Sequence, residues 1–228
     1  MEARGQLTVD DLVFIATTLS SSKRVYGYIL DSVFDKDTRY SVLDNPLLYE
    51  KIQEARPPHI SCYLFCYLKL RYVLTQNGFH GIDLAHFLAS AIQDVGSQLL
   101  IGTDTDMWCS PDAYVYDLYA ELMHTNDENA FLLGVALGNY VLTFAGLFPD
   151  KTQKIFLKED ITQEFIEEGI QGYQYAMECC EEANRMDMVP LLMEVKKNFR
   201  TLKDVVSKAF STDEENPTCL SSEIPFPL

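Results

Sequence analysis

The sequence predicts an all-α protein, on three observations. Apolar residues recur at three- and four-residue steps along most of the chain. No stretch of six or more residues alternates apolar and polar side chains as a half-buried strand would. Helix start signals precede most of the apolar segments. We expect a single bundle-like domain of about eight helices over residues 1–210, with central helices near 59–76 and 129–148, and a disordered, acidic and proline-containing tail over 211–228.

The first half of the chain begins with a helix after Thr8, whose hydroxyl is a capping group followed by two acids. Further helices are expected over about 25–34 and 46–55. From His59 to Leu74 nearly every residue is apolar, which is typical of a helix buried on all sides. Asn77-Gly78 is expected to end this helix, because glycine readily adopts the left-handed closing conformation.

The second half continues with a helix over about 82–100. Ser110-Pro111-Asp112 then combines a capping hydroxyl, a proline and an acid, which predicts a helix that runs to about 124. Capping signals also precede helices over about 160–185 and 190–209. The last of these has the most regular apolar pattern in the chain: Leu192, Val195, Phe199, Leu202, Val206 and Ala209.

Residues 130–149 carry no charge, and this segment is about as long as a membrane-spanning helix. Its three glycines, Asn139, Thr143 and its acidic N-terminal flank favour a buried helix of a soluble protein instead. We therefore expect no membrane contact. Gly134 and Gly138 follow Ala130 at four-residue steps, which predicts that another backbone approaches this ridge closely.

The last two helices carry opposite charges. Glutamates follow the outer face of residues 164–182, whereas lysines and an arginine are spaced along 196–208. This pattern predicts an antiparallel hairpin within the chain, joined by the short connection 184–189. The regular apolar seam is also compatible with packing against a second copy of the protein.

The formal net charge of −16 disfavours nucleic acid and anionic membrane surfaces as partners. A basic protein, self-association or a cation is compatible with it, although acidity alone also serves solubility. The N-terminus does not resemble a signal peptide, and none of the six cysteines forms a Cys-x-x-Cys pair. Reduced thiols and a cytoplasmic location are therefore expected.

Between Arg71 and Lys151 there is no lysine or arginine, but there are ten carboxylates and three histidines. Asp83–His86 and Glu121–His124 have the i, i+3 spacing that places two metal ligands on one helix face, as in helical di-metal proteins. Against this, the first pair carries aspartate rather than glutamate. We therefore expect no cofactor, and a divalent metal held by these four residues is the alternative.

A second candidate is an acidic loop with the only tryptophan. Asp104 and Asp106 resemble the start of a calcium loop, but Cys109 and Val115 stand where an EF-hand has glycine and glutamate. Trp108 either anchors the loop in the core or lies at an interface. The candidate interaction surface consists of Asp104, Asp106, Trp108, Asp112 and Asp117.

Because no catalytic motif stands out, the favoured hypothesis is a non-enzymatic protein–protein interaction or scaffold module. The tail segment from Ile224 to Leu228 is a possible docking segment. The alternative is a metal-dependent helical enzyme, a hydrolase or a di-metal carboxylate type, that uses the carboxylate–histidine pairs.

Overall fold

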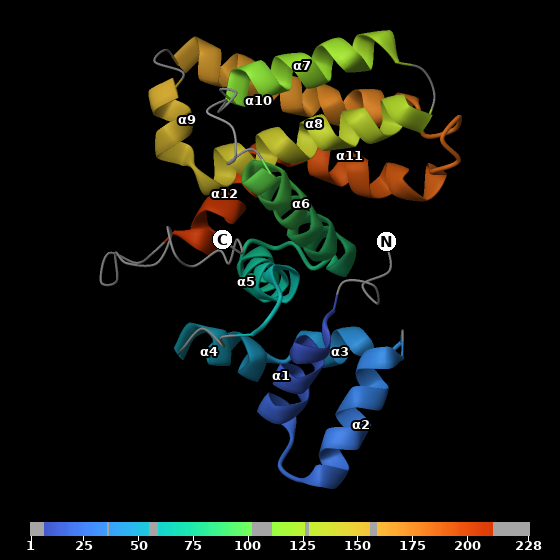
Figure 1. Ribbon diagram of the computed structural model, residues 1–228, viewed down its shortest axis with the longest axis vertical. Coiled ribbons are helices and arrows are strands. Elements are labelled where there is room, and N and C mark those ends of the chain that lie inside the picture. Colours follow the sequence, from blue (N-terminus) through green and yellow to red (C-terminus); the bar gives the residue numbers. More distant parts are fainter. Residues whose placement is uncertain are drawn as a thin grey trace. The chain divides into compact units, whose positions relative to one another are not determined.

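The computed structural model describes residues 7–35, 37–54, 59–101, 111–125, 128–155 and 159–211. Within these ranges all regular structure is helical, which confirms the predicted class (Figure 1). The described residues form more helices than the eight or so expected, because short helices occupy stretches interpreted as connections. The tail from residue 212 onward lies outside the described residues.

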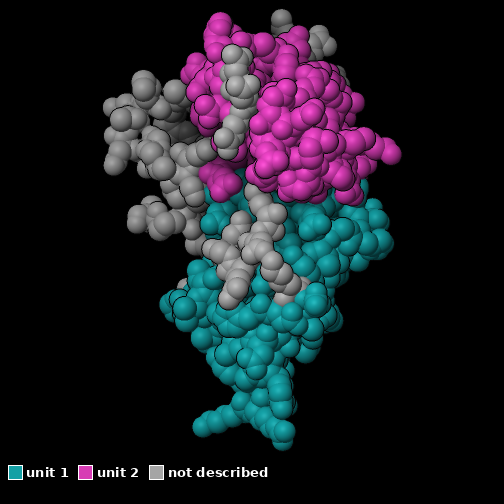
Figure 2. Space-filling model, turned by 90° about the vertical axis from the view of Figure 1, so that its right-hand side faces the viewer, with its two compact units in different colours: residues 1–93 teal, residues 94–228 magenta. Residues whose placement is uncertain are grey.

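The chain divides into two compact units, residues 1–93 and 94–228, which Figure 2 colours separately. The first contains α1 Val9–Leu19, α2 Lys23–Phe34, α3 Arg39–Leu43, α4 Pro46–Glu54, α5 Cys62–Gln76 and the first part of α6 Ile82–Ile101. The second contains the rest of α6, α7 Pro111–His124, α8 Glu128–Leu147, α9 Pro149–Ile155, α10 Glu159–Glu178, the 3₁₀ turn η3 Met186–Met188, α11 Val189–Lys197 and α12 Phe199–Phe210. The predicted single domain over 1–210 stays a prediction.

Helix α5 forms the centre of the first unit, as its apolar sequence predicts. Nine of its fifteen residues are buried, among them Tyr63 and Tyr67. Ser61 caps its start, since the Ser61 hydroxyl accepts a hydrogen bond from the Leu64 amide at 3.1 Å. Gly78 has a φ of 82°, in the left-handed region, which confirms the predicted closing glycine.

The start of α1 is held by a buried carboxylate. Thr8 and Asp11 form a capping box, in which each side chain accepts a hydrogen bond from the other's amide. Asp11 is fully buried, and its other carboxylate oxygen accepts a hydrogen bond from the Ser61 amide at 2.7 Å. One carboxylate therefore serves the N-terminal ends of both α1 and α5.

Helix α8 forms the core of the second unit. By length and composition alone, its Asn129–Leu147 segment is the one candidate membrane span among the described helices, and 67% of its apolar window is buried inside the structure. The core helix of a soluble protein has this character. A Cβ on Gly134 would lie 2.6 Å from the carbonyl oxygen of Gly172 in α10, so the predicted close backbone approach is confirmed.

The predicted hairpin of the acidic and basic helices is also present, with corrected ends. Helix α10 ends at Glu178, and a turn with Asn184 at a φ of 51° leads into η3. The single last helix expected over 190–209 is instead two helices that meet at Asn198. Arg200 of α12 donates to Glu167 of α10 at 2.6 Å, which joins the two charged faces within one chain.

Candidate functional site

An open groove of about 700 Å³ lies between α10 and α11 in the second unit. Methionines supply its apolar part, and amide and charged side chains supply the rest. We call it the α10–α11 groove; its lining residues are Gln174, Met177, Met193, Glu194, Lys196, Lys197 and Asn198. Its volume is within the range of about 300–1,000 Å³ that ligand pockets occupy.

Helix packing decides which side chains line this groove. Leu192 and Val195 of α11 are fully buried, so the intervening positions face outward. Met193 is consequently 58% exposed. On α10, Ala176 is fully buried and its neighbour Met177 is half-buried. The groove therefore contains apolar side chains that the helix–helix contact leaves uncovered.

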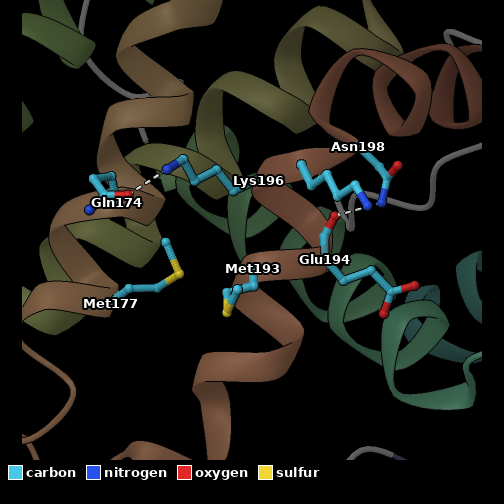
Figure 3. A pocket seen from close by; sticks show the side chains of 7 residues that line it. Gln174, Met177, Met193, Glu194, Lys196 and Asn198 are labelled. Carbon is cyan, nitrogen blue, oxygen red and sulfur yellow. Dashed lines mark hydrogen bonds between the residues drawn. The ribbon is translucent and has the colours of Figure 1, made fainter.

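A hydrogen bond connects the two helices beside the methionines (Figure 3). The Lys196 ammonium of α11 donates to the Gln174 side-chain oxygen of α10 at 2.5 Å. The Gln174 amide donates in turn to Glu178, one turn further along α10. Figure 3 shows Met177 on α10 and Met193 on α11 at the open space next to this bridge.

Asn198 ends α11 and borders the groove. Its side-chain amide donates to the Glu194 carbonyl oxygen at 2.9 Å, and its backbone amide uses the same acceptor. An asparagine side chain that competes for a helix carbonyl in this way favours a helix end. Lys196 and Lys197 therefore lie in the last turn of α11, where the helix dipole favours positive charge.

The groove is bordered by a basic part of an acidic chain. Residues 189–210 contain five bases and two acids, whereas the whole chain has a formal charge of −16. Arg200 is paired with Glu167, and Lys203 lies 2.9 Å from Asp204. Lys196 bonds a neutral amide, and Lys197 has no carboxylate within 4.0 Å among the residues that the structure describes. Uncompensated positive charge thus stands next to exposed methionine.

The first unit holds a different polar arrangement, a buried aromatic cluster around His86 of α6. The Tyr63 hydroxyl and the His86 Nδ1 atom form a hydrogen bond, and the Tyr67 ring stacks on the imidazole with ring centroids 4.5 Å apart. Tyr40 contacts the same ring edge-on at 5.2 Å. His86 is only 4% exposed, and its Nε2 atom has no hydrogen-bond partner within the described residues.

Tyr67 links this cluster to an ion pair. Its hydroxyl donates to Asp44 at 3.1 Å, and Arg71 binds the same carboxylate through two nitrogens at 2.9 and 2.7 Å. The hydrogen bond to Asp44 raises the pKa of Arg71. A pocket of about 260 Å³ lies beside the pair, with the stacked rings of Tyr49 and Tyr72 in its wall.

The electrostatics of the His86 cluster do not suit acid–base chemistry near neutral pH. Burial, and to a smaller extent the nearby positive charge of Arg39, lower the pKa of His86 to about 4. Burial also raises the pKa of Tyr63 and of Tyr67 above that of a free tyrosine. The ring is therefore neutral and the hydroxyls keep their protons, which is the chemistry of a structural network.

The residues proposed as metal ligands lie in different surroundings. Asp83 is exposed whereas His86 is buried, so this pair does not present two ligands to one solvent-facing site. Glu121 and His124 are both exposed on α7. Within the described parts of the chain, no three His, Cys, Asp or Glu side chains come together as a metal site.

The residues proposed as an interaction surface are mostly outside the described residues. This applies to Asp104, Asp106 and Trp108, and to the side chain of Asp112. Asp117 is exposed on α7. The acidic loop therefore stays a prediction.

Comparison of the chain with protein-family models, with curated proteins and with solved structures found no match. The α10–α11 groove was not among the sites expected from the sequence. Met193 is an apolar residue outside the regular seam of the last helix, followed by Lys196 and Lys197. That combination is the sequence signal from which an exposed apolar site with basic neighbours could have been predicted.

Proposed function

We propose that this protein is a non-enzymatic interaction module that binds a peptide segment of a partner protein in the α10–α11 groove. The segment carries apolar side chains next to carboxylates. The observation that supports this most is the juxtaposition of exposed Met193 with Lys196 and Lys197 along one open groove.

The methionines suit the apolar part of such a ligand. Methionine side chains are unbranched and polarisable, so they adapt to ligands of different shape, and they are frequent at peptide-binding surfaces. Covering Met193 would remove apolar surface from water, which contributes roughly 25 cal/mol per Å². The groove lies between two packed helices, so its lining is positioned before a ligand arrives.

The lysines suit the charged part. Lys196 bonds a neutral amide, so its charge is available to a ligand carboxylate that reaches the bridge. Glu194 and Glu178 are nearby, and they would repel a ligand whose acids are placed elsewhere along the groove. Charge would therefore select the register of the ligand as well as its composition. The remaining acidic surface still favours a basic partner, and that expectation is separate from the groove.

Display of a random peptide library against the full chain tests this proposal. Selected peptides are expected to be enriched in Asp and Glu adjacent to Leu, Ile, Phe or Met. Their binding should weaken at least tenfold in Met193→Asp and in Lys197→Glu, because one removes the apolar contact and the other reverses a charge.

The matched control is Met123→Asp, which changes a methionine that is 45% exposed on α7 in the same unit. Selected peptides should bind this variant as they bind the wild type. Equal loss in both methionine variants, or selection of peptides without acidic and apolar residues, would refute the groove as the binding site.

A further inference from the structure

The chain itself contains a segment with the composition that the groove favours. Residues 212–228 follow α12 and include Asp213, Glu214, Glu215 and Glu223, with no lysine or arginine. The apolar side chains of this segment are Leu220, Ile224 and Phe226 together with Leu228. Three of the four acids thus come first along the segment, and Glu223 lies among the apolar residues that follow.

The segment is long enough to reach the groove. Helix α12 has twelve residues and begins directly after Asn198, which lines the groove, so its far end at Phe210 lies about 18 Å along the helix from it. Leu220 is ten residues beyond Phe210, and ten extended residues span up to about 33–36 Å. Both α12 and the groove belong to the second unit, so this reach does not depend on the placement of the first.

The order of charges along α12 matches the order of groups in the segment. Lys208 lies in the last turn of α12, and Lys197 and Lys196 lie at the groove beyond its first turn. A segment that returns along α12 therefore brings Asp213 to Glu215 past positive charge before Leu220 reaches Met177 and Met193. The lysines attract the acids of the segment, and the methionines provide the apolar surface for the residues that follow.

We infer that residues 212–228 occupy the α10–α11 groove of their own chain, so that a partner peptide binds only by displacing them. This inference rests on the proposed function, since it assigns a regulator to the same groove. Tethering gives the segment an effective concentration on the order of millimolar, so even a weak contact competes with an external ligand. Prolines 217, 225 and 227 have no amide hydrogen, so recognition of this segment relies on its side chains.

Photo-crosslinking of the full chain tests where the segment lies. Benzoylphenylalanine replaces Leu220, and mass spectrometry of the monomer band maps the crosslinked residues. Crosslinks are expected at Met177 or Met193, and Lys196→Glu with Lys197→Glu should reduce them several-fold. Lys23→Glu with Arg24→Glu is the control, since it makes the same change of charge on α2. Crosslinks that map elsewhere, appear in dimers only, or persist in the groove double variant overturn the inference.

Peptide affinity separates this inference from the proposed function. The measured ligand is a library-selected peptide, and the two proteins are the wild-type full chain and the full chain with Leu220→Ser, Ile224→Ser and Phe226→Ser. Removal of the competing side chains is expected to tighten binding about tenfold, for an effective concentration of about 1 mM and a dissociation constant of about 0.1 mM for the contact of the segment with the groove. Equal affinity for both chains overturns the self-occupied groove and leaves the groove as a binding site. Binding to neither chain refutes the proposed function.

Discussion

Gly134 and Gly172 lie face to face where α8 crosses α10, each with its α-carbon against the backbone of the other helix. A Cβ on Gly134 would be 2.6 Å from the Gly172 carbonyl oxygen, and a Cβ on Gly172 would be 2.8 Å from that of Gly134. Backbone atoms cannot rotate away as a side chain can. The two glycines therefore set the distance between α8 and α10.

Replacement of Gly134 by alanine should destabilise the protein by about 1–3 kcal/mol, the usual cost of forcing an extra methyl into a packed contact. This loss exceeds the helix-propensity gain of about 1 kcal/mol that alanine brings. Urea unfolding followed by circular dichroism measures it. Gly27→Ala is the control, because a Cβ at Gly27 in α2 has no atom within 4 Å; that variant should be stabilised by up to about 1 kcal/mol.

Stability should depend on pH through His86. Its pKa of about 4 in the folded protein is lower than the usual value near 6.5, so below pH 6.5 the unfolded chain binds the proton more strongly. The stabilisation is therefore complete above about pH 6.5 and is lost as the pH falls toward 4, by about 3 kcal/mol in total. Chemical unfolding at pH 7.0, 5.5 and 4.5 measures this loss.

His86→Phe keeps an aromatic ring beside Tyr67 but has no titratable group. The variant should lose stability at pH 7, since the Tyr63 hydroxyl is left without its partner at His86. The fall in its stability between pH 6.5 and 4.5 should be smaller than that of the wild type. An unchanged pH profile would show that other groups cause the acid sensitivity.

The two ion pairs of Arg71 and Arg200 should differ in their contribution to stability. Asp44→Ala leaves Arg71, whose side chain is 15% exposed, and the Tyr67 hydroxyl without their shared acceptor, and should cost about 2 kcal/mol. Glu167→Ala removes a pair whose side chains are about half exposed, and should change stability by less than about 1 kcal/mol. Thermal unfolding of both variants at low and high salt compares them, and only the second effect should vanish at 1 M salt.

The sequence predicts those parts of the fold that depend on local chemistry. Thr8 and Asp11 signal a helix start through side-chain capping, and Gly78 signals a helix end because it lacks a Cβ. The burial of α5 follows from its lack of polar residues. The opposite charges of α10 and α12 indicate their pairing, which the Arg200–Glu167 contact confirms.

Other parts depend on contacts that no local pattern contains. The break at Asn198 needs a side chain that turns back onto the Glu194 carbonyl oxygen, although the apolar spacing continues unchanged through it. The burial of His86 depends on tyrosines from α3 and α5, which the i, i+3 spacing from Asp83 does not reveal. The α10–α11 groove exists only because the two helices leave Met177 and Met193 uncovered.

The carboxylate of Asp11 has a consequence for the kinetics of folding. It accepts hydrogen bonds from Thr8, three residues away, and from Ser61, fifty residues further along the chain. The first bond can form as soon as α1 does, whereas the second needs the intervening chain to be in place. We expect Asp11→Asn to accelerate unfolding more than it slows folding, because the long-range half of the contact forms after the transition state. In stopped-flow measurements the contact between Asp11 and Ser61 would therefore form late during folding and break early during unfolding.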